Sequence, residues 1–136
     1  PAQGQILRRF GDSDGLGSRL RGFAVATRAE AQVTAPADGR IEFSGPFRSY
    51  GQLLIIDAGE GHLILLAGME RITTEMGQVV RAGEPVAQMG KGPSSVTLLG
   101  DMMQEKRPVL YVELRKGGEA VDSAPWWIGG MKEASR

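Results

Sequence analysis

The protein has 136 residues, of which 41% are hydrophobic and 24% are charged, the size and composition of one globular domain with a single core. Basic and acidic residues both number 16, so the formal net charge is zero, which excludes a general electrostatic attraction to nucleic acid or to acidic membranes. The absence of cysteine excludes disulfides and thiolate chemistry. The single histidine, His62, excludes metal sites that need two imidazoles.

The start of the chain carries neither an initiator methionine nor the basic and apolar regions of a signal peptide. We therefore expect residues 1–136 to form a single domain from the C-terminal part of a longer protein, with any export signal upstream. No apolar run approaches the ~20 residues that span a bilayer as a helix.

Glycine and proline punctuate short apolar runs along the whole chain, with 20 glycines and 7 prolines. This pattern is typical of an all-β domain, because both residues interrupt helices and favour turns. The first predicted hairpin joins a strand at 33–35 to an alternating strand at 40–43, through a turn at 36–39 that contains proline, aspartate and glycine.

The second predicted hairpin joins 53–57 to 62–66 through a Gly-Glu-Gly turn at 59–61. Both strands are almost continuously apolar, which predicts burial on both faces and a place at the centre of the sheet. A third predicted hairpin covers 79–89, with its turn at 82–84, and a last strong strand covers 109–115.

Two further segments have weaker patterns. The insertion at 92–107 is predicted to be irregular, with one short helix over 98–104. Near the C-terminus, Trp126 and Trp127 form an aromatic pair that we expect to cover one end of the sheet.

The turns at 35–39 and 77–85 are similar to those of barrel-sandwich domains, the group that includes lipoyl and biotinyl carriers. Such carriers need a modifiable lysine on the hairpin between the two halves, and residues 41–76 contain no lysine. The resemblance therefore predicts the architecture and excludes the carrier function.

The order of these pieces also resembles the LytM-type zinc endopeptidase domain of cell-wall (murein) hydrolases. That resemblance implies an all-β, LytM/barrel-sandwich-like core of antiparallel hairpins with irregular loops. It rests on Gly22, the turn at 35–41, the segment 51–56, the hairpin ending at Gly68, the hairpin at 77–86, the run Leu110-Tyr111-Val112-Glu113-Leu114-Arg115 and the segment 121–127.

Active members of that family hold zinc with two histidines and one aspartate, drawn from an H-x-G-x-D motif and an H-x-H motif, and use further histidines to assist the attacking water. In this sequence, the positions that match the family's histidines and aspartate are Leu20, Ala24, Gly68, Val109 and Tyr111. Four of them offer no side-chain ligand, and a neutral tyrosine is a poor one. The resemblance therefore implies no metal, no other cofactor and no peptidase activity, and His62 matches no ligand position.

Within the family, the chain most resembles the degenerate LytM domain of EnvC-type murein hydrolase activators. The similar segments are Arg21-Gly22, Ser49-Tyr50-Gly51 and the run from Leu110 to Arg115. This resemblance implies a periplasmic regulator that binds a zinc-dependent N-acetylmuramoyl-L-alanine amidase and relieves its autoinhibition during cell division. It also implies an upstream coiled coil that connects to a membrane division complex.

We expect Arg21, Tyr50, Tyr111 and Arg115 to surround the emptied cleft and to bind a helix or an extended segment of the amidase. Tyrosine supplies flat contact area and a hydroxyl, and arginine supplies a planar fork for carboxylates or carbonyls, so both are frequent in protein-binding hot spots. Plainer alternatives stay open: Tyr111 as a strand residue that covers the sheet, Tyr50 as a cap on the barrel, and Arg115 as a surface partner of Glu113 or Glu119.

A rival function is a non-catalytic peptidoglycan-binding module, whose cleft holds stem peptides directly. That function predicts binding to isolated cell wall without an amidase. An enzyme with a different site has no support, because the sequence contains no nucleophile elbow, phosphate loop or close set of histidine and carboxylates.

Overall fold

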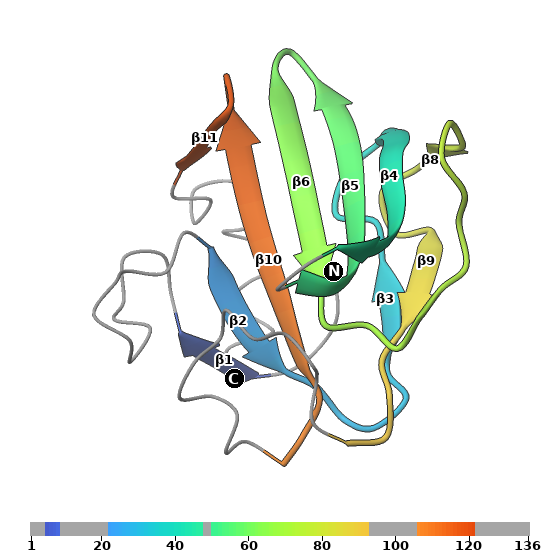
Figure 1. Ribbon diagram of the computed structural model, residues 1–136, viewed down its shortest axis with the longest axis vertical. Helices are drawn as coiled ribbons and strands as arrows, with labels where there is room; N and C mark the ends of the chain where they lie inside the picture. Colours follow the sequence, from blue (N-terminus) through green and yellow to red (C-terminus); the bar gives the residue numbers. More distant parts are fainter. Residues whose placement is uncertain (1–4, 9–21, 48–49, 93–105, 122–136) are drawn as a thin grey trace.

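The computed structural model describes residues 5–8, 22–47, 50–92 and 106–121 (Figure 1). The described residues form antiparallel strands and contain no α-helix, which confirms the all-β prediction. Nor does this part of the chain hold a helix long and apolar enough to cross a membrane. The strands are β1 (Gln5–Arg8), β2 (Phe23–Ala26), β3 (Gln32–Thr34), β4 (Gly39–Phe47), β5 (Gly51–Gly59), β6 (His62–Ala67), β7 (Arg71–Ile72), β8 (Val79–Val80), β9 (Pro85–Gln88), β10 (Val109–Lys116) and β11 (Glu119–Val121).

The strands form two sheets. The larger has eight strands in the order β1-β2-β10-β6-β5-β4-β8, with β11 paired to β10, and the smaller has three in the order β3-β9-β7. Strand β10 pairs along one edge with β2 and then β11, and along the other with β6. Because both edges of β10 are hydrogen-bonded, its side chains have fixed directions.

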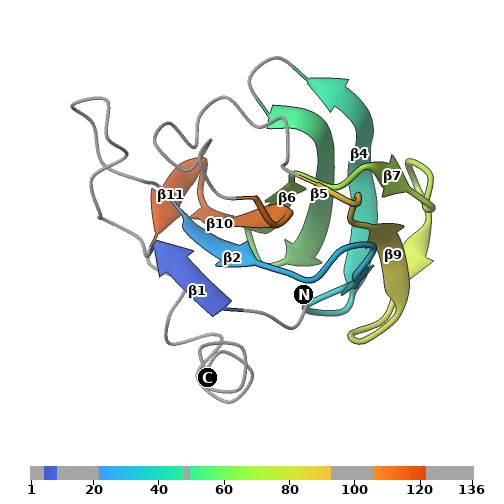
Figure 2. The same ribbon diagram turned by 90° about the horizontal axis from the view of Figure 1, so that it is seen from below.

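The main core lies between the two sheets. Figure 2 shows β7 and β9 of the smaller sheet beside the curved strands β4 and β5 of the larger one. Buried aliphatic residues from both sheets meet there, and they include Val33, Leu54, Ile56, Ile64, Leu66, Val86, Leu110 and Val112. Their alternation along β5, β6 and β10 sends every second side chain into this core.

The intervening side chains form a second buried cluster on the opposite face of the larger sheet. Its fully buried members are Ala24, Leu53, Leu65, Ala67, Val109 and Tyr111. The predicted hairpin at 53–66 is thus confirmed as β5 and β6, buried on both faces and central in the sheet. Its turn needs glycine at Gly59 and Gly61, where φ is +87° and +78°.

Glycine is also required where β2 begins. A Cβ atom at Gly22 would lie 2.1 Å from the carbonyl oxygen of Val112 on β10. The absence of a side chain at Gly22 therefore lets the chain enter β2 directly against β10.

The two other predicted hairpins are wrong. Strand β3 pairs with β9, and β4 pairs with β5 and β8, so the chain crosses between the sheets at 36–39 and again at 81–84. The physical reason is that these two turns bind each other. The N–H of Gly83 donates to the carbonyl of Ala35 at 2.8 Å, and the N–H of Ala82 donates to Asp38 Oδ1 at 2.7 Å.

Two predictions fall on residues that the structure leaves undescribed. The short helix at 98–104 lies within 93–105, and the pair Trp126 and Trp127 lies within 122–136. Both stay predictions.

Candidate functional site

Strand β10 positions the candidate site through its two-residue alternation. Leu110, Val112 and Leu114 belong to the core between the sheets. Val109 and Tyr111 belong to the cluster on the opposite face, and the same alternation puts the next two odd-numbered residues, Glu113 and Arg115, on that face.

Tyr111 lies between two alanines. Its register partners are Ala24 on β2 and Ala67 on β6, and all three belong to one buried cluster. Such small neighbours leave room for a large aromatic ring on the face of a sheet. The ring of Tyr111 is 1% exposed, and its centroid lies 6.2 Å from that of Tyr50.

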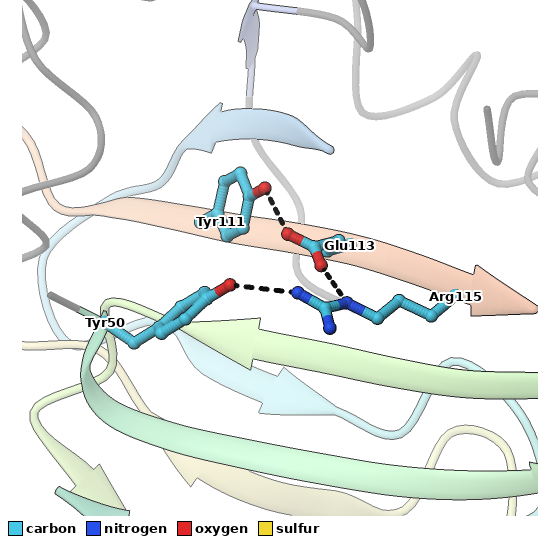
Figure 3. A network of polar contacts seen from close by, with 4 residues as sticks. All are labelled: Tyr50, Tyr111, Glu113 and Arg115. Carbon is cyan, nitrogen blue, oxygen red and sulfur yellow. Dashed lines mark hydrogen bonds and ion pairs between the residues drawn. The ribbon is translucent and has the colours of Figure 1, made fainter. Parts of the chain in front are cut away.

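Glu113 connects the polar groups of the site (Figure 3). Its side chain is 1% exposed, although it carries a carboxylate. The hydroxyl of Tyr111 donates to Oε1 at 2.6 Å, and Nε of Arg115 donates to Oε2. Nη2 of Arg115 also lies 3.5 Å from the hydroxyl of Tyr50, which precedes β5. The network therefore links β10 to the start of β5, and Tyr111 and Arg115 each donate a hydrogen bond to the buried carboxylate.

The surroundings of Tyr111 and Arg115 determine the protonation states of these two side chains. Burial raises the pKa of the Tyr111 phenol far above its ordinary value, and the charge and hydrogen bond of Glu113 add to the rise. Burial lowers the pKa of Arg115, but the hydrogen bond and charge of Glu113 outweigh it, so that pKa lies above its usual value. Tyr111 is thus a neutral hydrogen-bond donor, and Arg115 is a cation.

A row of aromatic rings extends from this network toward the end of β4. Ring centroids are 6.3 Å apart for Tyr50 and Phe47, and 5.7 Å apart for Phe47 and Phe43. Phe47 is 43% exposed. Sequence reasoning missed this row. The signal that was available is the four-residue spacing of Phe43 and Phe47, which puts both rings on one face of a strand.

The structure brings together three of the four residues expected at the site, Tyr50, Tyr111 and Arg115. Arg21 lies outside the described residues, as does Leu20. The expectation that the ring of Tyr111 offers contact area needs correction, because the ring is buried between the two strands that flank β10.

The alternative of a surface pair between Arg115 and Glu113 names the partner that Arg115 has in the structure, but the glutamate of this pair is buried and not on the surface. The Arg115 side chain is 31% exposed and that of Glu113 only 1%. Glu113 is the site residue that sequence reasoning missed. The alternation Tyr111, Glu113, Arg115 along one strand was the signal that joined all three to one face.

A zinc ion does not fit these residues. At the positions that match the family's ligands, Ala24 and Val109 offer no lone pair, Gly68 has no side chain, and the hydroxyl of Tyr111 is a neutral donor to Glu113. In the described part of the chain, no group of three or more histidine, cysteine, aspartate or glutamate side chains is placed to hold a metal.

The single histidine stands apart from the site. His62 begins β6 and is the register partner of Lys116, five residues or about 17 Å along β10 from Tyr111. Its Nδ1 lies 3.3 Å from the carbonyl oxygen of Gly59 in the hairpin turn. The partly exposed end of Arg115 on this sheet face can donate hydrogen bonds to a ligand.

Comparisons with known proteins agree with the fold. The sequence profile of peptidase family M23 matches residues 18–123. The chain is 30% identical over 126 residues to the murein hydrolase activator EnvC of Escherichia coli K12, covering 93% of this chain and 28% of that protein. It is 33% identical over 123 residues to the murein hydrolase activator NlpD of the same strain, covering 90% of this chain and 29% of that protein. The chain thus spans less than a third of the length of these relatives.

Solved structures have the same architecture. A mutant catalytic domain of the prophage-encoded M23 protein EnpA from Enterococcus faecalis superposes with a TM-score of 0.71 at 24% identity, over 96% of this chain and 93% of that one. The catalytic domain of lysostaphin, an antimicrobial peptidase from Staphylococcus simulans, superposes with a TM-score of 0.75 at 16% identity, over 93% of each chain. At these identities the likeness concerns the fold alone.

Proposed function

Because this chain belongs to peptidase family M23 and carries no zinc ligands at the positions that match the family's metal site, we propose that it is a non-catalytic activator of peptidoglycan hydrolysis. Relatives named murein hydrolase activators support this role. The role requires binding to a hydrolase and no chemistry on the cell wall by this chain.

One observation carries the proposal. The hydrogen-bonded network of Tyr111, Glu113 and Arg115 lies on the sheet face that carries Val109 and Tyr111, two positions that match histidines of the active family members. The phenol of Tyr111 and the carboxylate of Glu113 are buried. The guanidinium of Arg115 is partly exposed and lies beside Tyr50. Such a face suits recognition of another protein, because tyrosine provides contact area at small entropic cost and arginine provides directional hydrogen bonds.

The proposed partner is a zinc-dependent N-acetylmuramoyl-L-alanine amidase of the periplasm that acts in cell division. Arg115 and Tyr50 contact the amidase, together with Arg21 from the segment before β2. Tyr111 does not contact the amidase and supports the site through its hydrogen bond to Glu113. In the longer protein, an upstream coiled coil connects the domain to a membrane division complex.

Activation then follows from linkage. A domain that binds only the open form of an autoinhibited amidase shifts its population by the difference between its affinities for the two forms. Moving that equilibrium from 1:99 to 99:1 needs about 5.5 kcal/mol. An interface with a few buried hot-spot contacts supplies a difference of this size.

The test is release of dye from labelled cell wall by the host's amidase, with and without the domain, and by the domain alone. Release that rises only in the mixture supports the activator. Sedimentation of the domain with cell wall, without any stimulation of the amidase, would favour the peptidoglycan-binding module instead. Release by the domain alone would refute the non-catalytic role.

A further inference from the structure

Two of the three nitrogens of the Arg115 guanidinium contact neighbouring side chains. Nε donates to Oε2 of Glu113, and Nη2 lies 3.5 Å from the hydroxyl of Tyr50. Glu113 lies on the Nε side of the planar guanidinium, Tyr50 approaches Nη2 from the side away from Nε, and Nη1 makes no hydrogen bond within the described residues (Figure 3). The end-on edge formed by Nη1 and Nη2 can still donate two hydrogen bonds to a carboxylate, because a carboxylate is a stronger acceptor than the Tyr50 hydroxyl at 3.5 Å.

Glu113 is itself held in place. Its carboxylate is 1% exposed, and the Tyr111 hydroxyl binds the oxygen that Arg115 does not use. Tyr111 is buried with Ala24 and Ala67 as its register partners, so packing restricts the position of its hydroxyl. A buried carboxylate with both oxygens engaged gives Arg115 one orientation, whereas a solvent-exposed arginine samples many.

We propose that Glu113 is a positioning residue, which holds Arg115 so that its end-on edge receives an acidic side chain of the hydrolase partner. The proposal rests on the activator function proposed above. Glu113 also balances the charge of Arg115 within the site. Recognition therefore depends on the direction of the guanidinium more than on a net positive charge.

The first measurement follows the Nε–H resonance of Arg115 in a proton–nitrogen NMR spectrum of the isotopically labelled protein. In the wild type we expect a slowly exchanging, shifted resonance, since that hydrogen is bound to a buried carboxylate. Glu113→Gln retains one oxygen that can accept from Nε while its NH2 group donates to the Tyr111 hydroxyl, so the resonance should still exchange slowly but with a smaller shift. The double variant Glu113→Leu/Tyr111→Phe should lose it.

The double variant is chosen so that the protein still folds. It replaces both buried polar partners by apolar groups of similar size, which is far less disruptive than removing one of them. The partly exposed Arg115 then turns toward water, although Arg115 and Tyr50 themselves are unchanged. Glu119→Gln on β11, an exposed glutamate of the same hairpin, is the matched control.

The second measurement is stimulation of the purified amidase by each variant in the dye-release assay. We expect the folded double variant to stimulate about tenfold less than the wild type, as for loss of one oriented, charge-assisted contact. Glu113→Gln should keep most of the stimulation and Glu119→Gln all of it. Full stimulation by the double variant would overturn the positioning role.

Other outcomes separate this proposal from the function on which it rests. If the wild-type domain stimulates no amidase, the activator function fails, and the assignment of a hydrolase partner to Arg115 fails with it. If the wild type stimulates and the double variant stimulates equally, only the role of Glu113 is refuted. If the double variant loses sedimentation with cell wall in the absence of amidase, the carboxylate belongs to a peptidoglycan stem peptide, which overturns the protein partner.

Discussion

Tyr111 on β10 and Ala24 on β2 lie directly opposite each other, in register and in the same buried cluster. Both match ligand positions of the zinc peptidases that this chain resembles, and here they have become one packing unit of a large ring beside a methyl group. The chain has an aromatic ring at this place in the sheet, and the hydroxyl of that ring donates a hydrogen bond to Glu113.

A larger side chain at Ala24 should therefore disturb the site. Ala24 is fully buried, and we expect Ala24→Leu to destabilise the fold by about 1–3 kcal/mol through overpacking against the ring of Tyr111. Urea unfolding followed by circular dichroism measures this. An unchanged unfolding midpoint would show that the ring has free space beside it.

The hydroxyl of Tyr111 should contribute to stability separately from the ring. Tyr111→Phe removes one hydrogen bond to a buried carboxylate, with an expected loss of about 1.5–3 kcal/mol. Tyr111→Ala also empties the space of the ring, with an expected loss of about 3–5 kcal/mol. Equal unfolding free energies for the two variants would contradict the placement of the ring between β2 and β6.

Stability should fall at alkaline pH because of Tyr111. The folded state raises the pKa of this phenol above its ordinary value of about 10, so the folded protein holds the proton more tightly than the unfolded chain does. Below pH ~10 both states are protonated and the contribution is complete. Above it only the unfolded chain ionises, which lowers the free energy of unfolding by about 1.4 kcal/mol per pH unit.

The variant Tyr111→Phe isolates this contribution. Urea unfolding of both proteins at several pH values between about 9 and about 11 compares their slopes, since lysines and other groups titrate in both. We expect a shallower decline for Tyr111→Phe. Parallel curves would mean that the phenol is accessible to water in the folded state.

Lysine in place of Arg115 tests whether recognition needs the planar guanidinium or only a positive charge. Arg115→Lys keeps a cation that can pair with Glu113, but it loses Nε and the end-on edge. We expect stimulation of the amidase to drop by about tenfold and the unfolding temperature to change little. Stimulation equal to the wild type would assign the contact to charge alone.

Metal removal should leave the domain unchanged. Because the positions matched to zinc ligands offer none, we expect the same unfolding temperature with a chelator, without one and with added zinc. The amidase in the dye-release assay serves as the positive control, since chelation should stop its activity. A rise in the unfolding temperature of the domain with zinc would reveal a site among residues that the structure leaves undescribed.

The sequence by itself determined the strands and the faces of β5, β6 and β10. Local patterns are sufficient there: the apolar runs of β5 and β6 flank a Gly-Glu-Gly turn, and a period of two puts Tyr111 and Arg115 on one side. The resemblance in the run from Leu110 to Arg115 also identified the family. These conclusions depend on residues that are neighbours in the chain.

Tertiary structure alone decided which strands pair after a turn and what the site contains. Each of the turns at 36–39 and 81–84 connects a strand of one sheet to a strand of the other. They do so because the two turns bind each other, a contact between segments more than forty residues apart. Glu113 is 1% exposed on a strand that pairs with β6, and the Tyr50 hydroxyl reaches Arg115 only when β6 has brought β5 and β10 into one sheet. A glutamate two residues before an arginine suggests a surface pair from the sequence, and only the folded sheet shows that this carboxylate is buried and lies at the centre of the site.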